Sequence, residues 1–136
     1  MARIVYVDDQ PVLLQGMKTY LQEAGHEVWA TDSGAEALGR IQAGEADLLV
    51  QDVLRPVLDG RQLLRALWSD PKWTDFPVII VSGVATAAGL PVRGVSAEDH
   101  SPCVDMWLKK PWLPSQLILA VTTTLAARDA RRTRQT

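Results

Sequence analysis

Short apolar runs alternate with amphipathic segments along most of this 136-residue chain. The most constraining run is residues 78–81, which read Val-Ile-Ile-Val. A strand that is apolar at every position has to be covered on both faces, as in a parallel sheet with helices on both sides. Parallel strands need crossover connections, and the amphipathic segments between the apolar runs can supply them as helices. The pattern therefore predicts an α/β protein with a doubly wound parallel sheet.

Proline, glycine and serine residues indicate where the expected helices and strands begin and end. Pro11 suits the first turn of a helix that Gly25 ends, and Ser33 with Glu36 forms a capping-box pattern before a second helix. Residues 83–103 are rich in glycine and proline, which indicates a short helix and a long loop. The strands are expected at 4–7, 27–31, 47–52, 78–81 and 105–109, and the other helices at 34–43, from about 60 to 67, and 114–127.

Composition excludes several classes of function. The formal net charge is −2, whereas a general nucleic-acid binder would carry a basic footprint. Cys103 is the single cysteine, so no internal disulfide can form. The N-terminal residues do not resemble a signal peptide, and no apolar run approaches the ~20 residues of a membrane span. A soluble cytoplasmic protein that does not contact a membrane is expected.

Polar residues follow the apolar strands at the carboxyl edge of the predicted sheet. They are Asp8 and Asp9 after the first strand, Asp52 after the third, Ser82 after the fourth and Lys110 after the fifth. In open α/β sheets this edge is where ligands bind. Any one of these residues would mean little by itself, because Asp pairs usually cap helices and most lysines are solvated. Their order and common placement make a shared site the preferred interpretation.

The chemistry of such a set points to phosphoryl transfer. Three crowded carboxylates repel one another, and a hard cation such as Mg²⁺ relieves that repulsion. Ser82 offers a hydroxyl and Lys110 a mobile positive charge. Asp52 would then act as a nucleophile that accepts a phosphoryl group as an acyl phosphate, with Mg²⁺ and Lys110 stabilising the charge on the transferring oxygens.

At these residues the chain resembles the receiver domain of bacterial two-component response regulators, the CheY-like family. The resemblance covers residues 3–127. It rests on a combination of motifs: Val-Asp-Asp at 7–9, Asp52 with Pro56 and Asp59-Gly60 downstream, Val-Ser-Gly at 81–83, and Lys110-Pro111. It implies a (βα)5 flavodoxin-like fold with strand order 2-1-3-4-5.

The same resemblance implies a role for each residue. Asp52 would be the phosphoacceptor, and Asp8, Asp9 and the backbone carbonyl of Leu54 would bind Mg²⁺ together with it. Ser82 and Lys110 would contact the phosphoryl group. Ser82 and Trp107 would form the switch pair. A histidine kinase or phosphotransfer protein would be the phosphodonor, and a homodimer would form through the face made by the fourth helix, fifth strand and fifth helix.

Four departures from the family pattern stand out. Arg55 replaces a frequent methionine; it either reaches the phosphoryl group or points into water, and the second is favoured. Gln51 interrupts an apolar strand and needs a hydrogen-bond partner on the face opposite to Asp52. Trp107 stands where a tyrosine or phenylalanine is usual. The interval from Ser82 to Lys110 is longer than is common, which suggests an altered partner or dimer mode.

The leading functional hypothesis is a phosphorylation-dependent switch, assisting its own phosphorylation and dephosphorylation without being an enzyme with turnover. The alternative is a receiver-fold interaction module that signals independently of phosphate. A phosphatase of the haloacid-dehalogenase type is disfavoured, since the Asp-x-Asp it needs is absent and Asp8-Asp9 stands in its place. Residues 1–127 would form the receiver domain, and the arginine-rich residues 128–136 a solvated basic tail or linker. Trp73 and Trp112 are expected to be half exposed.

Overall fold

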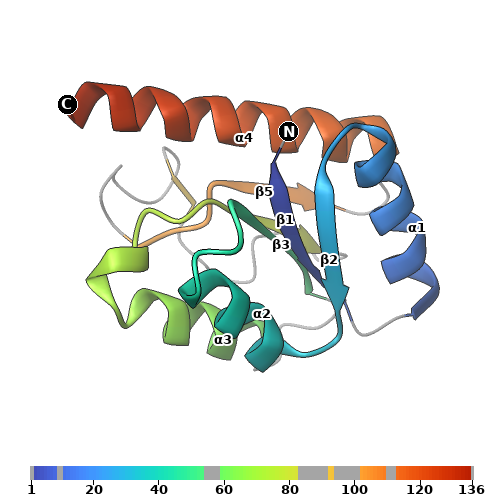
Figure 1. Ribbon diagram of the computed structural model, residues 1–136, viewed down its shortest axis with the longest axis horizontal. Coiled ribbons are helices and arrows are strands. Elements are labelled where there is room, and N and C mark those ends of the chain that lie inside the picture. The colour runs from blue at the N-terminus through green and yellow to red at the C-terminus, as the bar shows by residue number, and fades with distance from the viewer. Residues whose placement is uncertain are drawn as a thin grey trace.

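The computed structural model describes residues 2–8, 11–53, 59–82, 92–93, 102–109 and 113–135. Strands and helices alternate through most of this length, as the sequence predicts (Figure 1). In chain order the elements are β1 (Arg3–Val7), α1 (Pro11–Glu23), β2 (Glu27–Thr31), α2 (Gly34–Gln42), β3 (Leu48–Val53), α3 (Asp59–Trp68), the 3-10 helix η1 (Pro71–Trp73), β4 (Val78–Ser82), β5 (Met106–Lys109) and α4 (Pro114–Gln135).

The five strands form one parallel sheet with the order β2-β1-β3-β4-β5, which confirms the predicted fold class. The first connection runs from β1 outward to β2, and the chain then crosses back over β1 to β3. The order therefore changes direction next to β1 and β3. In a doubly wound sheet this switch point opens a crevice at the carboxyl ends of the two strands.

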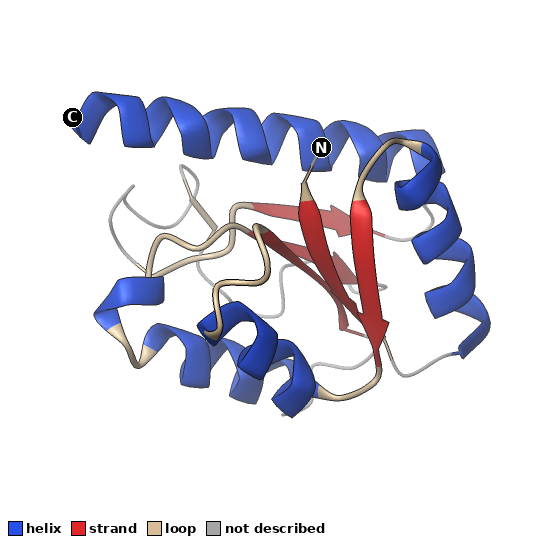
Figure 2. Ribbon diagram, in the orientation of Figure 1, coloured by secondary structure: helices blue, strands red, loops and turns tan. Residues whose placement is uncertain are grey.

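Helices cover both faces of the sheet, giving three layers (Figure 2). One apolar core lies between the sheet and helices α2 and α3, and includes Ile41, Leu64 and Ile80. The other lies between the sheet and helices α1 and α4, and includes Leu21, Ile79 and Leu117. The whole 78–81 run is buried, because neighbouring residues of β4 point alternately into the two cores.

Local signals fix the ends of two helices as expected. The backbone N–H of Glu36 donates to the Ser33 hydroxyl at 3.1 Å, so Ser33 caps α2. The carboxylate of Glu36 does not complete a direct capping box: it accepts from the Thr31 hydroxyl at 2.6 Å, and Thr31 in turn accepts from the backbone N–H of Ser33 at 3.0 Å. Gly25 has φ of 96°, a left-handed conformation that favours glycine after a helix.

One sequence prediction about a helix needs correction. The C-terminal helix was expected to end near Ala127 and give way to a frayed basic tail. It instead continues as α4 to Gln135 and lies across the sheet and past its edge (Figure 1).

The region between β4 and β5 is described only in part. Val92 forms an isolated parallel bridge with Val104, and the backbone N–H of Arg93 donates to the Val104 carbonyl at 2.8 Å. These contacts attach residues 92–93 beside the start of β5. The short helix predicted within 83–103 falls on residues outside the described ranges.

Candidate functional site

The strand register brings the described members of the predicted site to one edge of the sheet. Val7 of β1 pairs with Gln51 of β3, so Asp8 and Asp52 are the next residues along two adjacent strands. Val53 pairs with Ser82 of β4, and Ser82 pairs with Lys109 of β5. Adjacent strands lie about 4.8 Å apart. The backbone of four neighbouring strands therefore carries this set to the carboxyl edge, at the switch point of the sheet.

Asp8 is the acidic residue of this set whose side chain is described. It is 2% exposed, and its Oδ2 accepts a hydrogen bond from the Tyr6 hydroxyl at 3.3 Å. Its backbone N–H donates to the Thr31 carbonyl at 3.1 Å, which fixes the chain just after β1. These contacts hold a buried carboxylate at the carboxyl edge of the sheet, beside Asp52 in the strand register.

Several of the predicted site residues lie outside the ranges that the structure describes. Asp9, Leu54, Arg55 and Lys110 are outside the described residues, as are the side chains of Asp52 and Ser82. Among the groups that are described, no three acidic, histidine or cysteine side chains gather into a metal site. The three-carboxylate site consequently stays a prediction.

The donor chemistry at this edge fits Mg²⁺. Asp8 and Asp52 provide oxygen donors on adjacent strands, and oxygen is the ligand atom that Mg²⁺ prefers. Ser82, one strand further, adds a hydroxyl-bearing residue rather than a nitrogen or sulfur ligand.

Trp107 lies on β5 in the same register row as Ile80 and Gln51. It is half-buried and packs against the core under α2 and α3. Its Nε1 is buried without a hydrogen-bond partner, and so is Oε1 of Gln51, within the part of the chain that the structure describes. The partner that Gln51 was expected to need is therefore not found there. Both atoms are sites where a local rearrangement could gain a hydrogen bond.

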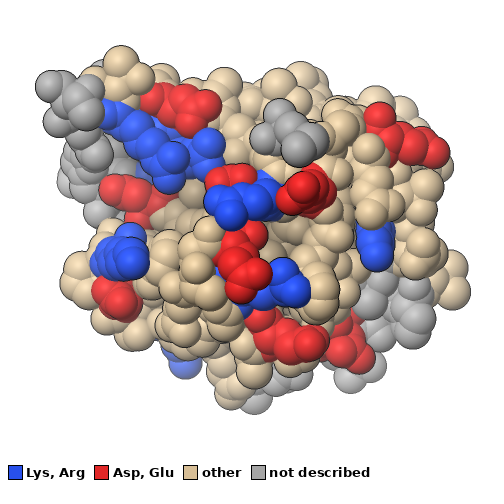
Figure 3. Space-filling view, viewed as in Figure 1, with Lys and Arg blue, Asp and Glu red and all other residues tan. Residues whose placement is uncertain are grey.

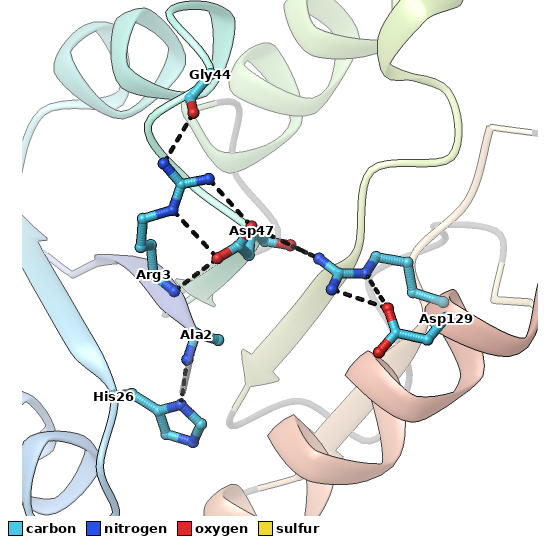
Figure 4. Close-up of polar contacts among 7 residues, drawn as sticks. Ala2, Arg3, His26, Gly44, Asp47 and Asp129 are labelled. Atoms are coloured by element: carbon cyan, nitrogen blue, oxygen red, sulfur yellow. Dashed lines mark hydrogen bonds and ion pairs between the residues drawn. The ribbon is translucent and has the colours of Figure 1, made fainter. Parts of the chain in front are cut away.

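Sequence reasoning missed an ionic network on the opposite edge of the sheet. Asp47, before β3, accepts from the backbone N–H of Arg3 at 2.8 Å and from the Arg3 guanidinium at 3.3 Å (Figure 4). Nη1 of Arg128 on α4 donates to the Asp47 carbonyl at 3.3 Å, and its other nitrogens contact Asp129. Arg128 thereby joins α4 to the start of β3.

A second ion-pair group surrounds Asp105, just before β5. Its Oδ1 contacts Nε of Arg93 at 2.7 Å and Nη2 of Arg131 at 3.4 Å. Its Oδ2 accepts from the backbone N–H of Val78 at 2.8 Å. The three charged side chains are at most 8% exposed. The prediction that the terminal arginines are solvated is therefore wrong for Arg128 and Arg131.

One signal could have revealed these arginines. The buried face of α4 contains Val121 and Thr124, and Arg128 and Arg131 follow at helical spacing on the same side. The buried face of α4 thus continues beyond its apolar residues with arginines, whose long side chains can bury their carbon atoms. Their acidic partners come from distant parts of the chain, so the pairing itself was not visible in the sequence.

The fold and the residues at its switch point define a receiver domain. The chain matches the response regulator receiver domain over residues 4–122 and belongs to that family. It is therefore a receiver domain of two-component response regulators. Receiver domains are signalling modules. Within the described ranges, no helix combines the length and apolar character needed to cross a bilayer.

Individual relatives support the same assignment. Protein PilH of Pseudomonas aeruginosa is 33% identical over 82 residues, covering 60% of this chain and 68% of PilH. Response regulator Rre1 of Synechocystis is 27% identical over 128 residues, covering 93% of this chain and 53% of Rre1. The chain spans only 11% of the gliding motility regulatory protein of Myxococcus xanthus, so some relatives are much longer.

Solved structures agree with the fold. CheY4 of Vibrio cholerae superimposes with a TM-score of 0.70 at 25% identity, covering 91% of this chain and 98% of that one. The receiver domain of the Francisella response regulator 1452 gives a TM-score of 0.73 at 28% identity, covering 93% and 98%.

Proposed function

We propose that this receiver domain is a phosphorylation-dependent switch that accepts a phosphoryl group on Asp52 in the presence of Mg²⁺. The observation that carries the proposal is the register of β1, β3 and β4, in which buried Asp8 adjoins Asp52, and Ser82 follows on the next strand. The Asp52 carboxylate attacks the phosphorus atom of the donor, an oxygen–phosphorus bond forms, and the donor leaves with the electrons of its own bond to phosphorus.

The surrounding residues have complementary roles in this proposal. Asp8, Asp9, Asp52 and the backbone carbonyl of Leu54 would hold Mg²⁺, which screens charge between carboxylates and phosphate. Lys110 would pair with the phosphoryl oxygens, and Ser82 would hydrogen-bond to them. The chain would act as a phosphoacceptor rather than as an enzyme with turnover.

Signalling would follow from a rearrangement that the added charge of the phosphoryl group causes near Asp52. Ser82 of β4 pairs with Lys109 of β5, and Trp107 lies two residues before Lys109 on β5. A movement at Ser82 would therefore displace β5 near Trp107. Trp107 has a buried indole N–H without a partner in the described part of the chain, which favours a second arrangement of this side chain. Ser82 and Trp107 are proposed as the switch pair on this basis.

The proposed partners follow from the family. A histidine kinase or a phosphotransfer protein would supply the phosphoryl group in the cytoplasm. A homodimer would form through the face that includes β5 and the C-terminal helix. No nucleic-acid contact is proposed for residues 1–127, and residues 128–136, largely an extension of α4, would serve as the link to any further domain.

Acetyl phosphate with Mg²⁺ tests the proposal directly. Intact mass after brief incubation should show a gain of one phosphoryl group, and Asp52→Asn should abolish it. Asp129→Asn is the matched control, because Asp129 is an exposed aspartate of α4 beside Arg128, at the edge of the sheet opposite to Asp52. Absence of an adduct at Asp52 in the wild-type chain would refute the proposal.

A phosphate-independent interaction module is the second candidate. The Trp107 indole N–H, which has no hydrogen-bond partner among the described residues, and the unusual interval between β4 and β5 favour it. Size-exclusion chromatography with light scattering separates the two functions. A shift in mass on phosphorylation that Asp52→Asn abolishes supports the switch. An oligomeric state or partner affinity that is identical in Asp52→Asn and in wild type, with or without acetyl phosphate, supports the module.

A further inference from the structure

A hollow of about 200 Å³ lies between η1 and the C-terminal part of α4. Four cationic side chains line it: Lys72, Arg128, Arg131 and Arg132. It is at the amino edge of the sheet, where β4 starts and Asp105 precedes β5, and so lies opposite the edge that carries Asp52. Figure 3 shows lysine and arginine atoms gathered over this end of α4, with acidic atoms beside them.

Arg131 is incompletely compensated. Its side chain is 8% exposed, and the one contact of its guanidinium in the described chain is Nη2 to Asp105 at 3.4 Å. Arg93, which also lies 4.0 Å from Asp75, contacts the same Asp105 oxygen at 2.7 Å, so Arg131 shares its carboxylate with a second buried guanidinium group. A buried cation that shares its counter-ion is stabilised by a further anion within reach.

The other lining groups increase the positive character of the hollow. Arg128 is already engaged by Asp47 and Asp129, whereas Lys72 and Arg132 are exposed and add two charges at the rim. Asp75 is the one carboxylate of the lining, and its Oδ1 lies 4.0 Å from Arg93. The chain as a whole carries a net charge of −2, so this concentration of cations departs from its average.

Two aromatic residues give the hollow a firm apolar wall. Trp73 and Phe76 pack edge to face with ring centroids 6.0 Å apart, and Phe76 is buried. The ammonium of Lys72 lies 4.9 Å from the centre of the Trp73 ring, which holds it beside the rim. Apolar walls around charges strengthen the field inside a concave site, because they exclude the water that would screen it.

We propose that this hollow binds a compact phosphate group, either as inorganic phosphate or pyrophosphate or as the phosphate of a small ester. A tetrahedral dianion offers several oxygens at once, which suits planar guanidinium donors from Arg131 and Arg132 and a point charge from Lys72. Lys72 lies over the Trp73 ring, where a nucleobase would otherwise stack, so recognition is assigned to the phosphate itself. This site is independent of phosphorylation at Asp52.

The test uses the full chain without Mg²⁺, so that the proposed acidic site contributes nothing. Phosphate, pyrophosphate and AMP are titrated in low-salt buffer, with calorimetry for affinity and proton–nitrogen NMR of the five tryptophan indoles for location. The Trp73 signal should shift more than the others. Arg132→Gln and Lys72→Gln should each weaken pyrophosphate binding about tenfold, the value of one charged hydrogen bond. Lys18→Gln on α1 makes the same charge change away from the hollow and should have no effect.

The outcomes separate clearly. Comparable affinities for phosphate and AMP support recognition of the phosphate group, with either source of it allowed. Tighter binding of pyrophosphate than of phosphate supports the conclusion that several cationic side chains of the hollow contact the ligand. No saturable binding of any of the three ligands overturns the proposal, and so does binding that Arg132→Gln and Lys72→Gln leave unchanged while both variants remain folded by circular dichroism.

Discussion

Asp47 accepts the backbone N–H of Arg3 at 2.8 Å and also contacts the guanidinium of Arg3, so one carboxylate joins the start of β1 to the start of β3. Burial by itself would raise the pKa of Asp47, but the hydrogen bonds from Arg3 outweigh it and hold that pKa below its usual range. The ionised form therefore stabilises the folded chain.

Asp47→Asn should lower the free energy of unfolding by about 1 kcal/mol at pH 7, the value of a partly exposed charged hydrogen bond. Since the folded pKa is depressed, this contribution is present above the ordinary pKa of about 4 and is lost as the pH falls through the folded value. Urea unfolding at pH 7 and pH 3 should show the difference between wild type and variant shrinking. Asp129→Asn, at an exposed aspartate, should change stability little; an equal effect would contradict the role of Asp47.

His26 should make stability depend on pH near neutrality. Its Nδ1 accepts the backbone N–H of Ala2 at 3.1 Å, and burial lowers the pKa of its imidazole. A depressed pKa means that the unfolded chain binds the proton first, so stability is present above about pH 6.5 and declines as the pH falls through the folded pKa. Thermal unfolding between pH 5 and 8 should show this slope. His26→Asn, which keeps an acceptor but does not titrate, should flatten it; an unaltered slope would assign the effect elsewhere.

Asp105 and Arg131 should differ in their importance for stability. Asp105→Asn removes the carboxylate that two buried guanidinium groups share, although Arg93 still has Asp75 at 4.0 Å, and should cost about 3 kcal/mol. Arg131→Met leaves Asp105 paired with Arg93 and should cost about 1 kcal/mol. Denaturant unfolding of both variants measures the difference. Equal losses in the free energy of unfolding would contradict this difference, because Arg131 would then contribute as much to stability as Asp105.

The C-terminal part of α4 should contribute to stability although it is rich in charge. A chain cut after Ala127 loses the contacts of Arg128 to Asp47 and of Arg131 to Asp105, and should be less stable by about 2 kcal/mol. A chain cut after Thr133 keeps both arginines and serves as the control. Indistinguishable midpoints of unfolding for the two chains would show that residues 128–133 act as a passive tail.

Cys103 should be unreactive in the folded chain. It is fully buried, and burial raises the pKa of its thiol, so the reactive thiolate is doubly suppressed. Reaction with a disulfide reagent at pH 8 should proceed only as fast as the chain opens, and should become rapid in denaturant. Fast labelling under native conditions would contradict the burial of Cys103.

The fold was largely predictable because its signals are local and repeated. The apolar run at 78–81, Ser33 before α2 and Gly25 after α1 each act within a few residues, and each has the predicted structure. The carboxyl-edge placement of Asp8, Asp52 and Ser82 was also predictable, since parallel strands must end at a common edge. The roles of these residues stay predictions that phosphorylation experiments can test.

The ionic attachments of α4 were not predictable, because they depend on contacts between distant residues. Arg128 meets Asp47 across 81 positions in the chain, and Arg131 meets Asp105 across 26. A composition rich in arginine suggests a solvated tail until the tertiary structure supplies buried carboxylates at the amino edge of the sheet. By itself the sequence determined the order of strands and helices and the edge at which the acidic residues gather, since periodicity and strand polarity are local properties. Only the tertiary structure decided which charges are buried together, because ion pairing is set by the packing of α4 against the starts of β3, β4 and β5.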